Sequence, residues 1–358
     1  MCTNFLRIDK ENRHQQKVSA RTMDFGTIVK PFPVTLKPNI VMYPRKQLFP
    51  HTSRIIENLE EDFRILPKKP LQWTNKYGFI SVDVGANIFN NIPLKVEKLS
   101  PILLDGINEK GLSAASLWLE GSEYQKESQE NNNLMFLNVV GYVLGMCADV
   151  VEVKDQLQKI NVTSPSKHLD KYPAHFVFID SNKNNPALIV EYVDGAPNFY
   201  TASNGVLTNE PVYPEMLKYL EDYGDLTVFQ KNQQSQPGLF GLPADSSPKS
   251  RFVRASKFME SINNEKNAHQ TVNFSEIAIQ NLQVPLGSVV SDKKNRILDY
   301  TQWSVIRDHL NLTYYFKSFD NQILKKIELK KVDFSHKKIV DFPIYNNEWN
   351  MDVTSNFN

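Results

Sequence analysis

The segments that are predicted to form strands occur in groups, and groups of predicted helices separate them. Short alternating or apolar runs are typical of strands, and longer segments with an apolar face at helical spacing are typical of helices. The predicted strands are residues 4–9, 18–23, 77–84, 112–119, 175–180, 187–193, 302–307, 312–317 and 326–329, and the predicted helices are residues 134–147, 151–160, 215–221, 251–262 and 274–282. Because strands and helices do not alternate regularly, this order favours an α+β layered sandwich over a doubly wound sheet. We expect one domain, residues 1–358.

Two early segments add detail to this prediction. Residues 4–9 and 18–23 flank a polar stretch, which predicts a hairpin. Residues 31–50 contain five prolines, so we expect an extended excursion between strands there.

The overall charge excludes two classes of partner. Lys and Arg number 41 and Asp and Glu number 40, so the formal net charge is +1. This balance predicts no electrostatic binding to nucleic acid or to an anionic membrane.

The chain also has no run approaching the roughly 18 apolar residues that a membrane span needs. The N-terminus becomes charged before an apolar core develops, so we expect no signal peptide within it. The protein is expected in the cytoplasm if Met1 is the native start, and in the periplasm or outside the cell if a signal peptide has been removed.

Common catalytic motifs are missing from the sequence. It contains no GxxxxGK[ST], GxGxxG or GxSxG pattern. Its seven histidines have neither HxxxH nor HExxH spacing, so each is predicted to be structural or on the surface. The two cysteines are too few for a disulfide framework. We expect no metal and no organic cofactor.

Cys2 offers a different chemistry. It follows Met1 directly, so removal of Met1 leaves a residue with both a thiol and a free α-amine. The thiolate is the nucleophilic form, and a free cysteine has a pKa of about 8.5. An α-amine titrates at about 7.7–8.0, so the residue supplies its own base. The pattern predicts a hydrolase with Cys2 as nucleophile, and the alternative is a cysteine that stands at this position by chance.

Arg21 and Asp24 lie on the second predicted strand of the hairpin. In a strand, Arg21 and Met23 share one face, while Thr22 and Asp24 share the other. A guanidinium near Cys2 favours the thiolate, and a carboxylate holds the ammonium form of the α-amine. The alternative is a surface ion pair, which contributes little to stability.

Five groups of residues then resemble one family, in the same order along the chain. They are residues 1–3 (MCT) with 21–25 (RTMDF), 105–112 (DGINEKGL), 207–211 (LTNEP), 242–252 (LPADSSPKSRF) and 301–304 (TQWS). Together they resemble the choloylglycine hydrolases, which include bile salt hydrolases and penicillin V acylases. The second group resembles a turn of the family, and Ala244 replaces a glycine of its LPGDxSSxSRF segment. The resemblance covers nearly the whole chain and implies the N-terminal nucleophile hydrolase fold, a four-layer αββα sandwich of two antiparallel sheets.

The resemblance also implies roles for five residues. Cys2 matches the nucleophile and base, and Arg21 and Asp24 match the residues that line it. Asn209 matches the asparagine whose side-chain amide donates to the oxyanion, although a turn residue before proline is the alternative. Arg251 matches the active-site arginine of the SRF segment, and the alternative is a solvent-facing residue in the first turn of a helix.

Trp118 departs from the bile salt hydrolases, which have asparagine at the corresponding place. Its backbone N–H matches the second oxyanion donor of the family, and its side chain is expected to shape the acyl pocket. A tryptophan buried in the sandwich core is the alternative. Cys147 lies on the apolar face of a predicted helix, so we expect an inert core residue.

The implied reaction is hydrolysis of a linear amide through an acyl-enzyme. The expected partner is a small amide with a hydrophobic acyl group, such as penicillin V or an N-acyl homoserine lactone. Conjugated bile salts, an amidase of the ceramidase-like branch and a non-catalytic binding protein are the alternatives. We expect a homo-oligomer, either dimer or tetramer. The interval from Asn209 to Arg251 is shorter than in the tetrameric Gram-positive bile salt hydrolases, which implies a different or looser assembly.

Overall fold

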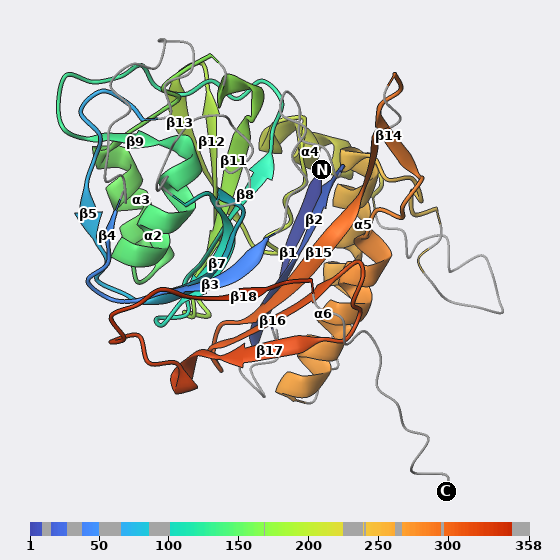
Figure 1. Cartoon of the computed structure of the whole chain (residues 1–358). Helices are drawn as coiled ribbons and strands as arrows, with labels where there is room; N and C mark the ends of the chain where they lie inside the picture. Colours follow the sequence, from blue (N-terminus) through green and yellow to red (C-terminus); the bar gives the residue numbers. More distant parts are fainter. Residues whose placement is uncertain are drawn as a thin grey trace, which may run out of the picture.

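Two antiparallel sheets lie face to face between two pairs of helices, as Figure 1 shows. The computed structural model describes residues 1–8, 16–26, 38–49, 66–85, 101–167, 169–224, 239, 241–261, 267–294 and 297–345. The architecture is the predicted α+β sandwich with helices on both outer faces.

The first sheet contains the N-terminus. Its order is β1-β2-β15-β16-β17, and β14 pairs with β15. The strands are β1 (Cys2–Ile8), β2 (Lys17–Phe25), β14 (Val289–Asp292), β15 (Ile297–Asp308), β16 (Thr313–Ser318) and β17 (Lys325–Glu328). β1 and β2 pair from Cys2 opposite Met23 to Ile8 opposite Lys17, which confirms the predicted hairpin.

The second sheet has the order β13-β12-β11-β8-β7-β6-β3-β18. Its strands are β3 (Asn39–Tyr43), β6 (Phe79–Asp83), β7 (Leu103–Asn108), β8 (Ser113–Trp118), β11 (Ala174–Ile179), β12 (Ala187–Val193), β13 (Ala196–Ala202) and β18 (Val340–Pro343). Two small ribbons accompany it, formed by β4 (Leu48–Phe49) with β5 (Trp73–Thr74) and by β9 (Asn133–Met135) with β10 (Asn161–Thr163).

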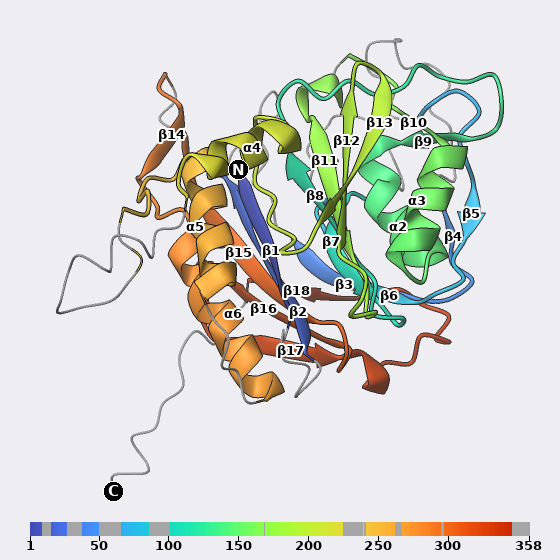
Figure 2. The same cartoon turned by 180° about the vertical axis from the view of Figure 1, so that it is seen from behind.

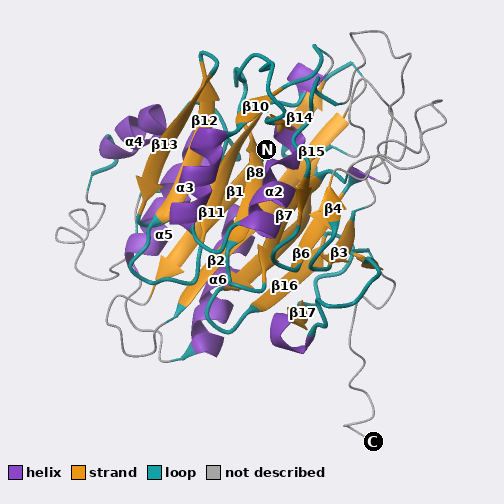
Figure 3. Ribbon diagram, turned by 90° about the vertical axis from the view of Figure 1, so that its left-hand side faces the viewer, coloured by secondary structure: helices purple, strands orange, loops and turns teal. Residues whose placement is uncertain are grey.

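Helices cover the outer face of each sheet. α2 (Val139–Met146) and α3 (Val150–Lys159) pack on the second sheet, in front of its strands in Figure 3. α5 (Pro248–Ser261) and α6 (Ala268–Leu282) pack on the first sheet, and α4 (Tyr213–Glu221) lies beside α5 (Figure 2). The side chain of Asp149 caps α3 by accepting hydrogen bonds from the first-turn N–H groups, which is why the helix begins there.

The apolar residues form two cores. One lies between the sheets and under α5 and α6, and it includes the buried residues Ile107, Leu117 and Trp303. The other lies between the second sheet and α2 and α3, and it includes Phe136 and Val143. In the part of the chain that is described, no helix is long and apolar enough to cross a membrane.

The structure corrects three of the predicted segments. The segment 105–112, expected as a turn, begins inside β7 and turns only after Asn108. There the Asn108 N–H donates to the Leu112 carbonyl at 2.9 Å, and the Leu112 N–H donates to Asn108 Oδ1 at 3.1 Å. The predicted helix 134–147 starts later, because residues 133–135 pair with β10 instead. The excursion 31–50 contains β3, a strand within the second sheet, whereas residues 31–37 and 50 lie outside the described residues.

Candidate active site

Cys2 begins β1 and is buried, with 3% of its surface exposed. Its backbone N–H donates to Asn209 Oδ1 at 2.9 Å, and its Sγ lies 3.4 Å from Met23 Sδ. The segment that carries Asn209 pairs with β1, because the backbone groups of Asn4 and Leu207 exchange hydrogen bonds of 2.8 and 3.0 Å. This pairing fixes Asn209 beside the N-terminal residue.

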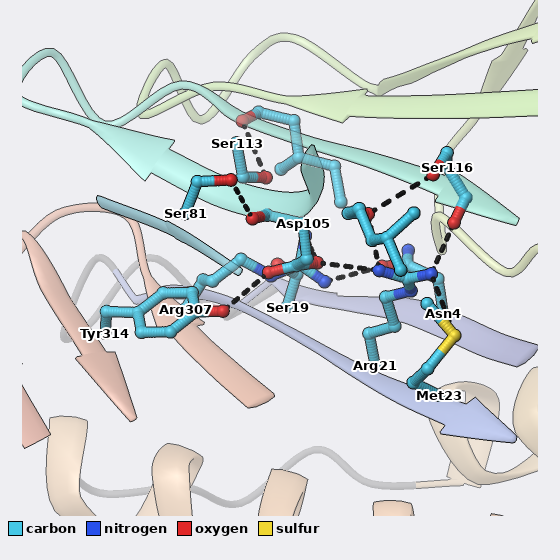
Figure 4. Close-up of polar contacts among 12 residues, drawn as sticks. Asn4, Ser19, Arg21, Met23, Ser81, Asp105, Ser113, Ser116, Arg307 and Tyr314 are labelled. Carbon is cyan, nitrogen blue, oxygen red and sulfur yellow. Dashed lines mark hydrogen bonds and ion pairs between the residues drawn. The ribbon is translucent and has the colours of Figure 1, made fainter. Parts of the chain in front are cut away.

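Arg21 lies in the space between the sheets, where Figure 4 shows it beside Met23 and Ser116. Its Nη2 lies 3.6 Å from Cys2 Sγ and also donates to the carbonyl of Ser116 in β8. Its Nη1 donates to the carbonyl of Leu104 in β7 at 2.6 Å. The second sheet therefore holds a guanidinium of the first sheet against the sulfur.

A buried charge cluster lies behind Arg21 (Figure 4). Asp105 Oδ2 lies 3.5 Å from Arg21 Nη1 and 3.2 Å from Arg307 Nη1, and Tyr314 donates to Asp105 Oδ1 at 2.9 Å. Burial and the charge of Asp105 raise the pKa of Tyr314 well above its ordinary value, so Tyr314 remains a phenol. Two guanidinium groups face one carboxylate, so the cluster places a net positive charge behind the thiol.

Arg251 approaches Cys2 from the helix layer. It lies in α5 and is fully buried. Its Nη1 donates to the Cys2 carbonyl and, at 2.7 Å, to Thr3 Oγ1, and its Nη2 donates to Asn209 Oδ1 at 2.7 Å. Burial lowers the pKa of Arg251, and the charge of Asp24 opposes this shift. The side chain joins β1 to the Asn209 segment.

Asp24 lies on the same face of the sheet as Thr22 and is fully buried. Its carboxylate accepts from Thr22 Oγ1 at 2.8 Å and from Thr301 Oγ1 at 2.5 Å. Thr22 Oγ1 in turn accepts from the Thr3 N–H at 3.0 Å. The carboxylate therefore reaches β1 through a threonine. Burial raises the pKa of Asp24, and the charge of Arg251 opposes this shift.

Asn209 and Trp118 meet at the end of β8. Asn209 Nδ2 donates to the Trp118 carbonyl at 2.8 Å, which leaves the second N–H of this amide for another acceptor. In an extended strand the N–H and C=O of one residue point to the same edge. The Trp118 N–H therefore points to the edge where Asn209 lies.

The structure brings the predicted site residues together and removes several of the alternatives. Arg21 and Asp24 are 1% and 0% exposed and contact different partners, so they are not a surface ion pair. Arg251 is 0% exposed, so it does not face solvent. The Trp118 side chain is 41% exposed, so the alternative of a buried core tryptophan is wrong.

Sequence reasoning missed the residues that hold this set in place. Thr22 lies within the RTMDF segment and Thr301 within TQWS. Their place in these motifs is the only sequence signal that could have pointed to them as partners of Asp24. Asp105 begins the DGINEKGL segment, but its pairing with Arg307 depends on contact between the two sheets. The spacing of Asp105 and Arg307 along the sequence does not indicate that the two residues meet.

Cys147 and the possible metal ligands are the remaining reactive groups of the described residues. Cys147 is fully buried, and burial raises the pKa of its thiol to about 12, which confirms an inert core residue. Among the described residues, His, Cys, Asp and Glu side chains form no group of three or more that could hold a metal ion.

Comparison with known proteins identifies the family. The family model of linear amide C–N hydrolases, choloylglycine hydrolase family, matches residues 2–342. A penicillin V acylase of Pectobacterium atrosepticum is 28% identical over 83% of this chain and 81% of its own length. A bile salt hydrolase/transferase of Lactiplantibacillus plantarum is 26% identical over 85% of this chain and 89% of its own.

Solved structures show the same fold. The penicillin V acylase from Agrobacterium tumefaciens superimposes with a TM-score of 0.71 at 24% identity, over 95% of this chain and 90% of its own. Its likeness supports the N-terminal nucleophile hydrolase fold. The chain belongs to the choloylglycine hydrolase family of linear amide C–N hydrolases.

Proposed function

We propose that this amide hydrolase uses Cys2 as its nucleophile and the α-amine of Cys2 as its base. The observation that carries the proposal is the surrounding of Cys2. Arg21 Nη2 lies 3.6 Å from Sγ, and the backbone nitrogen of Cys2 bonds Asn209 Oδ1 at 2.9 Å. One partner places a positive charge beside the sulfur, and the other orients the nitrogen that becomes the amine.

The reaction has two acyl-transfer steps. The thiol proton moves to the α-amine, and the thiolate forms a bond to the amide carbon. The amide C–N bond then breaks as the α-ammonium protonates the leaving amine. Water attacks the thioester carbon as the α-amine takes one of its protons. The C–S bond then breaks and the α-ammonium gives that proton to the sulfur, which releases the carboxylic acid and restores the thiol. Asn209 Nδ2 and the Trp118 N–H are the proposed oxyanion donors, and one such donor contributes about 2.7–4 kcal/mol.

Removal of Met1 is part of the proposal. The terminal amine of Met1 donates to the Asp24 carbonyl, and the Asp24 N–H donates to the Met1 carbonyl at 2.9 Å. With Met1 attached, the Cys2 nitrogen is a peptide N–H and has no basicity. Its removal creates the base and also frees the backbone N–H and carbonyl of Asp24 that bond Met1.

The substrate preference follows from Trp118. Its half-exposed side chain stands next to the proposed oxyanion donors and offers a flat apolar wall that contacts aromatic or fatty acyl groups. We propose penicillin V or long-chain N-acyl homoserine lactones as preferred substrates. The relative named as a bile salt hydrolase/transferase keeps conjugated bile salts as the second candidate.

A substrate panel tests the proposal. We expect kcat/KM to be higher for penicillin V or an N-acyl homoserine lactone than for glycine- and taurine-conjugated bile salts, and Trp118→Asn to reduce this preference. Cys2→Ala is the control and should have no turnover with any of them. Bile salts as the best substrates of the wild type would contradict the preference, and turnover by Cys2→Ala would contradict the nucleophile.

A further inference from the structure

We propose that the buried pair of His175 and Glu191 positions Asn209 for catalysis by holding both ends of the segment that carries it. This inference rests on the oxyanion role proposed for Asn209. His175 lies on β11 and Glu191 on the neighbouring β12, and both side chains are 0% exposed. The hydrogen bonds of His175 and Glu191 go to Thr208, to Tyr213 and to each other, and not to Cys2, Arg21 or Arg251.

The first end of the segment is held by the imidazole. His175 Nε2 lies 3.2 Å from the carbonyl oxygen of Thr208, the residue directly before Asn209. Thr208 itself is fully buried, and its hydroxyl donates to the Pro248 carbonyl at 3.0 Å. The backbone that leads into Asn209 is therefore fixed from two sides.

The other end is held by the carboxylate. Glu191 Oε1 and Oε2 accept from the backbone N–H of Tyr213 at 3.1 and 2.9 Å. Tyr213 is the first residue of α4, where an N–H has no partner within the helix. His175 Nδ1 and Glu191 Oε1 are 2.9 Å apart, so one continuous chain of hydrogen bonds joins Thr208 to Tyr213.

The protons of this chain can be counted. Thr208 offers a carbonyl oxygen, so Nε2 must carry a proton to bond it. The contact between Nδ1 and Oε1 requires a second proton between those atoms. The pair therefore holds two protons and is neutral as a whole, either as imidazolium with carboxylate or as imidazole with carboxylic acid.

A role in stability alone explains this pair poorly. Burying two ionisable groups costs desolvation energy, and a hydrophobic pair of similar volume is often as stable. What the pair supplies is geometry, because two rigid strands fix the ends of a short segment. Asn209 Nδ2 must lie close to a developing oxyanion, and a displacement of about 1 Å in such a site lowers the rate by about 10²-fold.

A double-mutant cycle tests the coupling between His175 and Asn209. We expect His175→Gln to lower kcat by about tenfold with little change in KM, because a misplaced oxyanion donor mainly affects the transition state. In the Asn209→Ala background the same substitution should lower kcat less than about twofold, since no donor remains to be positioned. Glu191→Gln should behave in the same way, and it keeps the test available if His175→Gln does not fold.

His309→Gln is the matched control. His309 is also fully buried and bonds the Gly111 carbonyl at 2.8 Å and Ser19 Oγ at 2.8 Å, away from the Asn209 segment. It should lower Tm like His175→Gln but show no coupling to Asn209. Equal loss of kcat from His175→Gln in both backgrounds would overturn the positioning role. Full activity of Asn209→Ala would instead overturn the oxyanion role, so the two failures are distinct.

Discussion

Asp24 is a charged residue in surroundings that favour its neutral form. Its carboxylate is fully buried, and two threonine hydroxyls and the charge of Arg251 only partly offset the loss of water. Ionisation of this carboxyl in the native state therefore costs free energy. Such a cost is typical of functional sites, where activity and stability compete.

We predict that Asp24→Asn lowers kcat by about 10²-fold and raises Tm at pH 7. Because folding raises the pKa of Asp24, protonation favours the native state, and that advantage is lost as pH rises through the folded pKa. The Tm gain of the variant should therefore be largest near neutral pH and vanish below about pH 4, where the carboxyl is protonated in both states. Calorimetry of both proteins from pH 3 to pH 8 measures this, and a gain that grows toward acid would contradict it.

At the residue scale, sequence predicted which side chains gather but not all of their contacts. Strand alternation correctly placed Arg21 and Asp24 on opposite faces, and the structure gives Arg21 the sulfur contact. The carboxylate of Asp24 bonds Thr22 and Thr301, a partner from another strand that only the tertiary fold brings close. His175 was predicted as structural or surface, and its burial agrees with the structural reading.

At the scale of elements, the ion pairs of Asp105 join the two sheets. Asp105 lies on β7 of the second sheet, whereas Arg21, Arg307 and Tyr314 lie on β2, β15 and β16 of the first. Side chains from the two sheets thus meet over one buried carboxylate. Its removal leaves two guanidinium groups unpaired in the core.

We predict that Asp105→Asn lowers the free energy of unfolding by about 3–5 kcal/mol, as expected when one partner of a buried ion pair is lost. Tyr314→Phe is the matched variant, since it removes one hydrogen bond to the same carboxylate and no charge, and it should cost about 1–3 kcal/mol. Urea unfolding of the three proteins compares these values. A smaller loss for Asp105→Asn than for Tyr314→Phe would show that the ion pairs do not hold the sheets together.

Most strands of the two sheets could be predicted from sequence, but β3, β7, β13, β14 and β18 were missed, and two of these five share a reason. β7 and β3 were hidden because their segments carry a turn motif or lie among prolines, and pairing with neighbouring strands overrides these local signals. The start of α2 was wrong for the same reason, because residues 133–135 pair with β10. The local sequence pattern predicts that a helix or strand forms, but pairing with neighbouring strands determines where it begins and ends.

At the scale of the whole molecule, the layers place Cys2 where both sheets and a helix layer reach it. Arg21 comes from between the sheets, Arg251 from α5 and Asn209 from the segment after β13. Since the second sheet contributes to both apolar cores, a single domain remains our prediction. The family and the fold followed from ordered motifs, whereas the substrate depends on loops that sequence motifs do not describe.

The activity of two preparations that differ only in Met1 tests the central claim most directly. A cleavable fusion can release either the chain that begins at Cys2 or the chain that begins at Met1, and intact mass verifies each N-terminus. We predict turnover of penicillin V or another accepted amide by the chain beginning at Cys2, and a loss of at least about 10²-fold with Met1 attached, because the base is then a peptide nitrogen. Equal kcat of the two preparations, with Met1 still present after the assay, would contradict the account.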